Sequence, residues 1–348
     1  MLASFLYSLS IGAVGGALFA WLNTPLPWML GPLVFNLIAA MSRQPVAVPE
    51  RARLYFLGVL GLVLGSHVTA EMGMRMLQWP VSAALLLIGV AASTMLCAWW
   101  LRRRGFDPVS AWFSAAPGAM TAMIMMGEAS GGDPRKIALS QSLRIVLILL
   151  ILPPLFWWMA DSATVATETS SKTGSQFSAA WLLLTIPPLI ALGKKTKLPT
   201  PALLLPLGVS SSLSLFEVAR FDVPGWGLNL MLLVLGSSIG ARFRGLSLQA
   251  LRAHMADSVV ATLLALGVMA AIAEVLHLTM GTPYDVALMA MAPGGIGELA
   301  ILAVALHLDP VFVAFHHMLR VVALMGAAPL IARQLNRRAE RMTRNDGG

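Results

Sequence analysis

The residues of this sequence best suited to bind a ligand are two copies of one tripeptide and the arginine that follows each copy. Ala-Pro-Gly occurs at residues 116–118 and again at 292–294, both times inside an apolar stretch. Proline removes a backbone donor and glycine loosens the chain, so each tripeptide predicts a helix break. A break exposes N–H groups at the start of the next half-helix, where the dipole favours an anion. A packing kink is the alternative, because Gly and Pro are common in membrane helices.

Each break is followed by an arginine at the same spacing. The Asp-Pro pairs at 133–134 and 309–310 are typical of an N-cap followed by a first-turn proline. Arg144 lies ten residues after its proline (144 − 134 = 10), and Arg320 lies at the same distance from its own. Ten helical residues span about 15 Å, half of an apolar core ~30 Å thick, so both arginines are expected near the midplane. Such an arginine has two possible roles, which can coexist. It binds a ligand, or it donates hydrogen bonds to the carbonyls that the break leaves without partners.

Polar neighbours complete the predicted site. Gln141 and His317 precede the two arginines by three residues, so each shares a helix face with its arginine. Glu298 follows the second break and is interpreted either as a proton- or cation-coupling carboxylate or as a salt-bridge partner of Arg320. The substrate-binding residues predicted from the sequence are Pro117, Gly118, Ala119, Thr121, Gln141, Arg144, Pro293, Gly294, Gly295, Gly297, Glu298, His317 and Arg320.

The composition indicates an all-α integral membrane protein. Of 348 residues, 57% are hydrophobic and only 11% are charged, whereas soluble domains have about 25% charged residues. Apolar runs approach the ~20 residues that cross a bilayer. The net charge of +8 comes largely from short basic clusters between these runs, such as residues 102–104 and 194–197. Such clusters are typical of cytoplasmic loops, so the expected partner is the lipid bilayer of the cell inner membrane and not nucleic acid.

The chain contains two copies of one pattern. Pro117 and Pro293 are 176 residues apart (293 − 117 = 176), and the same spacing separates Arg144 from Arg320. Leu-Val-Leu-Gly-Ser occurs at residues 62–66 and 233–237, and Pro-x-Pro-x4-Pro-Leu begins at residues 25 and 199. We interpret residues 1–160 and 178–335 as membrane repeats. Residues 161–177 are then an extracytoplasmic linker and residues 336–348 a basic cytoplasmic tail.

The basic loops decide between two topologies. Each copy has six apolar segments, and if all six crossed the membrane, the basic residues near 194–197 and 242–252 would lie outside. If the broken fifth segment enters and leaves on one side, the basic loops lie inside. The sequence therefore predicts about ten transmembrane helices plus two broken or re-entrant helical segments. Five crossings per copy make the repeats inverted in topology and place both termini in the cytoplasm, a plan typical of secondary transporters. The expected segments are 2–22, 26–41, 54–70, 79–101, 106–130, 135–160, 178–192, 199–216, 226–241, 254–277, 284–307 and 310–332.

Other chemistry finds little support in the sequence. His307, His316 and His317 lack the i, i+4 spacing of a helical metal site, so neither a metal centre nor a resident cofactor is expected. A coupling cation or proton remains open, and a homodimer is compatible with the sequence. No Walker loop, dinucleotide fingerprint or nucleophile elbow stands out, so the chain is not expected to be an enzyme.

The repeated motifs resemble those of the AbrB-like duplicated membrane protein family, over nearly the whole chain. The resemblance rests on Pro-x-Pro-x4-Pro-Leu, the Leu-Gly-Ser span and Ala-Pro-Gly with its mid-helix arginine. Residues 294–297, Gly-Gly-Ile-Gly, are also similar to the re-entrant Gly-Gly-x-Gly motif of 2-hydroxycarboxylate and glutamate sodium symporters, whereas residues 118–121, Gly-Ala-Met-Thr, depart from it.

Three functions follow from these sequence features and resemblances. The predicted function is secondary transport of a small anionic metabolite by alternating access. The alternative is a membrane-embedded ligand sensor or regulator of gene expression. The third candidate is a membrane enzyme, as in the family label "ammonia monooxygenase". It ranks last because the sequence lacks the spacing of metal ligands that such an enzyme needs.

Overall fold

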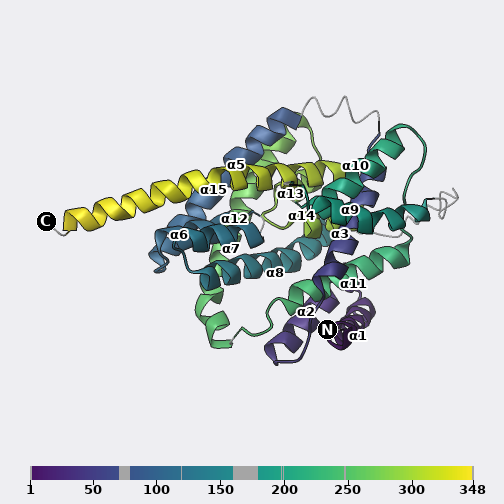
Figure 1. The fold of residues 1–348 in the computed structure, drawn as a ribbon, viewed down its shortest axis with the longest axis horizontal. Helices are drawn as coiled ribbons and strands as arrows, with labels where there is room; N and C mark the ends of the chain where they lie inside the picture. Colours follow the sequence, from purple (N-terminus) through teal and green to yellow (C-terminus); the bar gives the residue numbers. More distant parts are fainter. Residues whose placement is uncertain are drawn as a thin grey trace. The chain divides into compact units, whose positions relative to one another are not determined.

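The computed structural model describes residues 2–69, 79–118, 120–159, 179–196, 198, 200–246 and 248–346, and these residues form helices and connecting turns without strands. Figure 1 shows their order along the chain. The first copy forms α1 (Leu2–Trp21), α2 (Pro27–Met41), α3 (Glu50–Ser66), α5 (Trp79–Arg103), α6 (Pro108–Ala115), α7 (Met120–Ala129) and α8 (Pro134–Met159). The second forms η1 (Ala180–Thr185), α9 (Ile186–Gly193), α10 (Pro201–Leu215), α11 (Gly225–Ala241), α12 (Leu248–Met280), α13 (Tyr284–Met291), α14 (Ile296–Ala305) and α15 (Pro310–Asp346).

Several helices are long and apolar enough to cross a membrane. Within the described residues they are α1, α5, α8, residues 254–280 of α12 and residues 310–335 of α15. Shorter apolar helices include α2, α10, α11 and α14. The chain is therefore a helical membrane protein. Two helices extend beyond the apolar segments, because α12 begins at Leu248 and α15 continues through the basic residues as far as Asp346.

Both helix breaks that the sequence predicts are present. In the first copy α6 ends at Ala115 and α7 begins at Met120, and in the second α13 ends at Met291 and α14 begins at Ile296. The helix that follows each break starts as expected, since α8 begins at Pro134 and α15 at Pro310. The aspartate before each proline accepts backbone N–H groups of the first turn, at 2.9 and 3.3 Å in α8 and 3.2 Å in α15.

The chain folds into two compact units that cut across the sequence copies. Unit 1 comprises residues 1–78, 149–247 and 300–311. Within it α2 packs on α1 and α11, and α3 packs on α10. A Cβ at Gly65 of α3 would meet the α10 backbone, and one at Gly236 of α11 would meet that of α2. The small residues of the two Leu-Gly-Ser motifs thus let each motif pack closely on a helix of the other copy.

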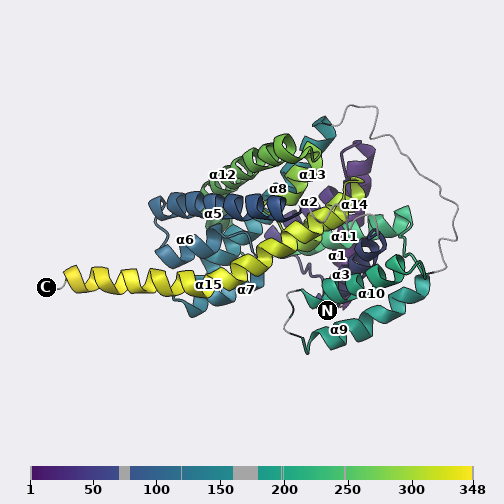
Figure 2. The same cartoon turned by 90° about the horizontal axis from the view of Figure 1, so that it is seen from above.

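Unit 2 comprises residues 79–148, 248–299 and 312–348. Within it α5 packs against α12 and α6, and α12 packs against α13 (Figure 2). It contains both helix breaks and both of the arginines predicted to lie at the midplane. The candidate site is therefore built entirely within unit 2.

Candidate functional site

The first break leaves a carbonyl without its helical donor, and a side chain of α8 supplies the missing N–H group. In a helix, residue 117 would donate to the carbonyl of residue 113, but Pro117 has no N–H. Gln141 Nε2 donates instead to Phe113 O at 2.7 Å and also to Ala116 O at 2.9 Å. The amide group, which has two N–H donors, therefore replaces the backbone bond that proline removes.

Arg144 holds the remaining carbonyls at the end of α6. Its Nη1 donates to Ser114 O at 3.3 Å and Ala115 O at 3.1 Å, and its Nη2 donates to Ala116 O at 3.4 Å and to Gln141 Oε1. The side chain is buried. These carbonyls carry the partial negative charge of a helix C-terminus, so a cation there is favourable. Because that partial charge is only about half an elementary charge, much of the guanidinium's positive charge remains uncompensated.

The second break repeats this arrangement with histidine in place of glutamine. Pro293 cannot donate to Met289 O, and His317 Nε2 lies 3.1 Å from that oxygen. A carbonyl only accepts, so Nε2 carries the proton, and Nδ1 accepts from Arg320 Nη2 at 2.6 Å. The two contacts together fix His317 as the neutral Nε2–H tautomer.

Arg320 donates hydrogen bonds to the backbone of the second break itself. Its Nη1 donates to Ala292 O at 2.7 Å and its Nη2 donates to Gly294 O at 2.5 Å. The side chain is 0% exposed, the largest fully buried side chain in the described residues. In both copies the arginine therefore satisfies carbonyls next to the break, one of the two roles that the sequence left open.

A polar cavity lies beside Arg144. Its lining includes Arg144, Ser114 and Ser140 together with Ser258 of α12 and Cys97 of α5. Arg144 Nε and the three serine Oγ atoms are all buried and have no hydrogen-bond partner in the described structure. An unsatisfied buried polar group costs about 1–3 kcal/mol. Four such groups around one cavity therefore mark a place where a polar guest would be stabilised.

The cavity is small in this conformation. The space open to the centre of a water molecule is about 10 Å³, which is room for about one water. Sequence reasoning missed Ser258, because serines in apolar helices commonly bond to their own backbone and give no sign of which one lines a cavity. Only the packing of α5 against α12 and α6 brings Ser258 and Cys97 to Arg144.

The other predicted site residues lie around the breaks with varied exposure. Pro117, Pro293 and Gly297 are buried, Thr121 is exposed, and Ala119 lies outside the described residues. The part-buried residues are Gly118, Gly294, Gly295 and Glu298.

The space beside the second-copy glycines is filled by the chain itself. A Cβ at Gly294 would meet the Leu299 side chain, and one at Gly295 would meet the Glu298 carboxylate. Direct ligand contact with these glycines stays a prediction, because in this conformation neighbouring side chains occupy that space.

Glu298 belongs to the first turn of α14. It is the third helical residue, and its carboxylate lies against Gly295, which precedes the helix. A carboxylate at this place stabilises a helix N-terminus through the dipole and by reaching back to the free N–H groups. Arg320 bonds to Ala292, Gly294 and His317, so the structure does not show the alternative Arg320–Glu298 salt bridge in its described part.

Both arginine side chains are buried in unit 2. Neither has a carboxylate partner among the described residues. Two buried positive charges without counter-charges create a positive potential inside an apolar protein, and this potential favours an anion. A single site shared by both breaks stays a prediction.

The fold and these contacts define the class of the protein: a helical membrane protein with two broken helices, each held by a buried arginine. The chain belongs to the AbrB family, because the family model described as "Transition state regulatory protein AbrB" matches residues 28–336. The family that the sequence motifs indicate is thus confirmed.

Two relatives are similar over most of their length. The chain is 25% identical over 321 residues to the "Putative regulator AbrB" of Escherichia coli (strain K12), covering 90% of this chain and 91% of that protein. It is 26% identical over 356 residues to "Uncharacterized protein YhjN" of Bacillus subtilis (strain 168), covering 95% and 93%. No solved structure matches the chain.

Proposed function

We propose that this protein is a secondary transporter that moves a small anionic solute by alternating access. The observation that carries the proposal is the cavity beside Arg144, with one cationic donor and three hydroxyl groups that lack partners. An ionised carboxylate has about four lone-pair positions and no donor of its own. It would accept from Arg144 Nε and from the hydroxyls of Ser114, Ser140 and Ser258, and its charge would offset that of the guanidinium.

The size of the cavity agrees with a closed state of a transport cycle. A space of about 10 Å³ does not accommodate an organic acid, so loading requires α12 or α5 to move away from α6. The helix breaks provide positions where the half-helices can shift without unwinding a continuous helix. The cycle would need no resident cofactor and no catalytic group. Glu298 is the proposed site for a coupling proton or cation, since it is the acidic residue next to a break and its counterpart is Ala122.

The proposal includes an inverted membrane topology in the cell inner membrane. In it the ten crossings leave both termini in the cytoplasm and residues 161–177 outside. Single cysteines at positions 168 and 196, in a variant without Cys97, test this arrangement in whole cells. An impermeant thiol reagent should label position 168 and leave position 196 unlabelled. Equal labelling from outside would contradict the inverted repeats.

Binding and transport can be tested with the single native cysteine. Cys97 lines the cavity and is 1% exposed, so it should react with a small permeant thiol reagent only when the packed helices separate. An anion bound in the cavity should slow that reaction. A panel of small organic acids is first screened for thermal stabilisation of the purified protein, and a hit is then tested for Cys97 protection and for uptake into proteoliposomes. Protection with uptake supports the transporter. Stabilisation without protection of Cys97 would place the ligand elsewhere.

A membrane-embedded sensor is the second candidate, because the family model and one relative carry a regulatory description. A sensor needs the same anion site without translocation. Ligand protection of Cys97, combined with no uptake above empty liposomes under proton or sodium gradients, would favour the sensor over the transporter.

A further inference from the structure

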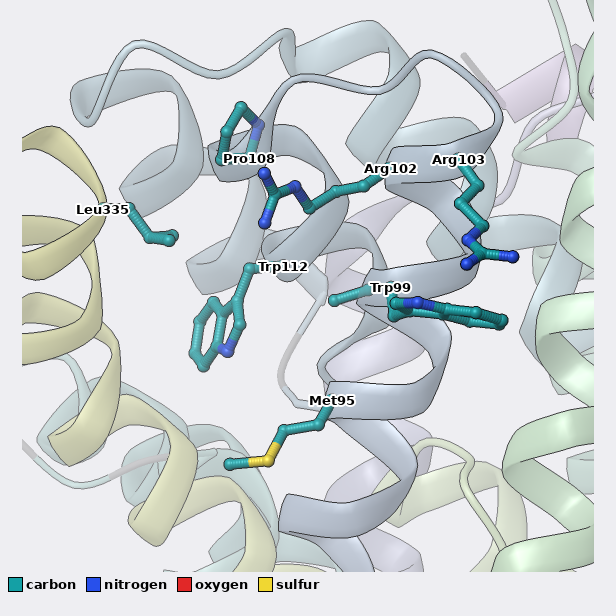
Figure 3. Close-up of a pocket in the computed structure, with 8 residues that line it drawn as sticks. Met95, Trp99, Arg102, Arg103, Pro108, Trp112 and Leu335 are labelled. Carbon is teal, nitrogen blue, oxygen red and sulfur yellow. The ribbon is translucent and has the colours of Figure 1, made fainter. Parts of the chain in front are cut away.

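A second cavity of unit 2, which we call the α5 groove, lies at the basic end of α5 and is separate from the Arg144 cavity. It has a volume of about 450 Å³ and is bounded by α5, α6 and α15 (Figure 3). Met95 and Leu335 form apolar parts of its wall, and Trp99 and Trp112 contribute aromatic rings. It therefore combines an apolar surface with a basic end.

Two arginines supply the charge of this groove. Arg103 stacks on Trp99, with its guanidinium carbon 4.1 Å from the ring centre. Arg102 extends toward Pro108 and Trp112 in Figure 3 and has neither a hydrogen bond nor an ion pair within the described part of the chain. The lining contains no carboxylate. The carboxylate next to the lining residues, Asp107, is engaged as the N-cap of α6 and accepts from a backbone N–H at 2.8 Å.

The groove has the polarity profile of a membrane surface. Met95 is 70% exposed within a helix apolar enough to span the bilayer, so this residue faces lipid. Arg102 lies seven residues further along α5 (102 − 95 = 7), which is about 10 Å of helix. That distance matches the depth between the upper acyl chains and the headgroup phosphates. Tryptophans concentrate at this interface, and basic pockets between membrane helices bind anionic headgroups.

We propose that this groove is a binding site for an anionic phospholipid. The phosphodiester binds Arg102, and the acyl chain lies along Trp112 and Met95. Arg103, which points to the other side of α5 in Figure 3, adds to the positive charge of this region. Phosphatidylcholine has the same phosphate but adds a quaternary cation, which two arginines repel. The site therefore discriminates by net headgroup charge. This inference depends on the membrane location of the protein and not on its transport activity.

Lipid-dependent thermal stability of the purified full-length protein tests the proposal. We compare phosphatidylglycerol with phosphatidylcholine at equal concentration in detergent, and include sn-glycerol 1-phosphate as a headgroup without acyl chains. The wild type should melt at least 5 °C higher with phosphatidylglycerol than with phosphatidylcholine. The double variant R102Q/R103Q should lose most of this difference. The matched control Arg51→Gln, an exposed arginine of α3, should keep it.

Native mass spectrometry provides a second measurement that does not depend on stability. The wild type should retain one phosphatidylglycerol under conditions that remove it from R102Q/R103Q. Equal stabilisation by both lipids, or equal losses in the control variant, would overturn the proposal. Full stabilisation by glycerol phosphate alone would identify a soluble-phosphate site instead. A lipid-free dimer cross-linked through a cysteine at position 95 would show that a second copy covers the groove.

Discussion

The two broken helices differ at one position that changes what the neighbouring arginine can do. Gln141 has two N–H donors and satisfies both Phe113 O and Ala116 O. His317, as the neutral tautomer, has one N–H donor and satisfies only Met289 O. Among the described side chains, Arg320 alone donates to Ala292 O and Gly294 O, with hydrogen bonds of 2.7 and 2.5 Å. In the first copy Ala116 O receives hydrogen bonds from both Gln141 and Arg144, and the hydrogen bonds from Arg144 to carbonyls are 3.1–3.4 Å long.

The two arginines also differ in their surroundings, because the hydroxyl groups that lie beside Arg144 have no equivalent beside Arg320. Ser114 and Ser140 line the cavity beside Arg144, and their counterparts in the second copy are Ala290 and His316. The alanine removes a hydroxyl, and the imidazole fills space and bonds to the Ser82 hydroxyl at 2.8 Å. The comparison supports the proposal that the second break is mainly structural and that a ligand would bind beside the first. The predictions below test this proposal.

The largest effect should come from removing the second arginine. Arg320→Met leaves Gly294 O and the His317 Nδ1 atom without a donor, at about 1–3 kcal/mol each, whereas Ala292 O keeps the Gly294 N–H at 3.0 Å. Removing a charge from the membrane interior offsets only part of this loss of stability.

Arg144→Met also frees acceptors, namely Ser114 O, Ala115 O and Gln141 Oε1. The cavity beside them has room for about one water molecule that can donate to them. We therefore expect a net destabilisation of about 3 kcal/mol for Arg320→Met and about 1 kcal/mol for Arg144→Met. Thermal unfolding of both variants in the same detergent measures the difference. Equal destabilisation by the two substitutions would contradict a mainly structural role for the second break.

Anion affinity should depend on the first arginine. Arg144→Gln removes the one charged donor at the cavity, and a hydrogen bond to a charged group contributes about 1.5–3 kcal/mol. We expect affinity for an identified organic acid to fall by about 10- to 100-fold. Titration of thermal stability or of Cys97 protection measures the affinity. Arg320→Gln serves as the comparison, and a greater loss of affinity in that variant would reverse the assignment.

The cavity serine of α12 should have a smaller effect. Ser258→Ala removes one neutral donor, worth about 0.5–1.5 kcal/mol, so affinity should fall about 2- to 10-fold with little change in stability. Ser238→Ala is the matched control, since Ser238 is also buried but belongs to unit 1 and donates to the Leu235 carbonyl. The same titration reports both variants. Unchanged affinity in Ser258→Ala would remove α12 from the site.

The smallest effect on stability should come from replacing His317 with glutamine, the residue at the matching position of the first copy. His317→Gln keeps a donor for Met289 O and an acceptor for Arg320, so stability should change by less than about 1 kcal/mol. His317→Leu removes both and should destabilise the protein by more, about 2 kcal/mol. If the two variants unfold at the same temperature, the imidazole has a role that an amide does not replace.

Much of the helical plan was readable from local chemistry. Proline followed directly by glycine within apolar stretches locates the two breaks, because proline removes an N–H group and glycine has a low helix propensity. Proline without a following glycine does not break the helix at Pro32 of α2, Pro206 of α10 or Pro329 of α15. Asp133 and Asp309 locate the start of the following helices for a similarly local reason. Ten crossings and their inversion rest on the distribution of basic loops and remain a prediction.

The site was only partly readable. Gln141, Arg144, His317 and Arg320 were predicted from their spacing to each break, and the structure places all four on carbonyls at or beside those breaks. Ser258 was not predicted, because it lies far along the chain in an apolar helix and no local pattern separates it from a serine bonded to its own backbone.

The sequence by itself determined that the protein is a duplicated helical membrane protein with two helix breaks, each followed by an arginine at the same spacing. These features depend on composition, periodicity and the covalent chemistry of proline, which are properties of short segments. Only the tertiary structure decided which donors each carbonyl receives, and that the sequence copies are shared between two compact units. It also decided that the unsatisfied polar groups gather beside Arg144, because burial and pairing depend on atoms that distant helices bring together.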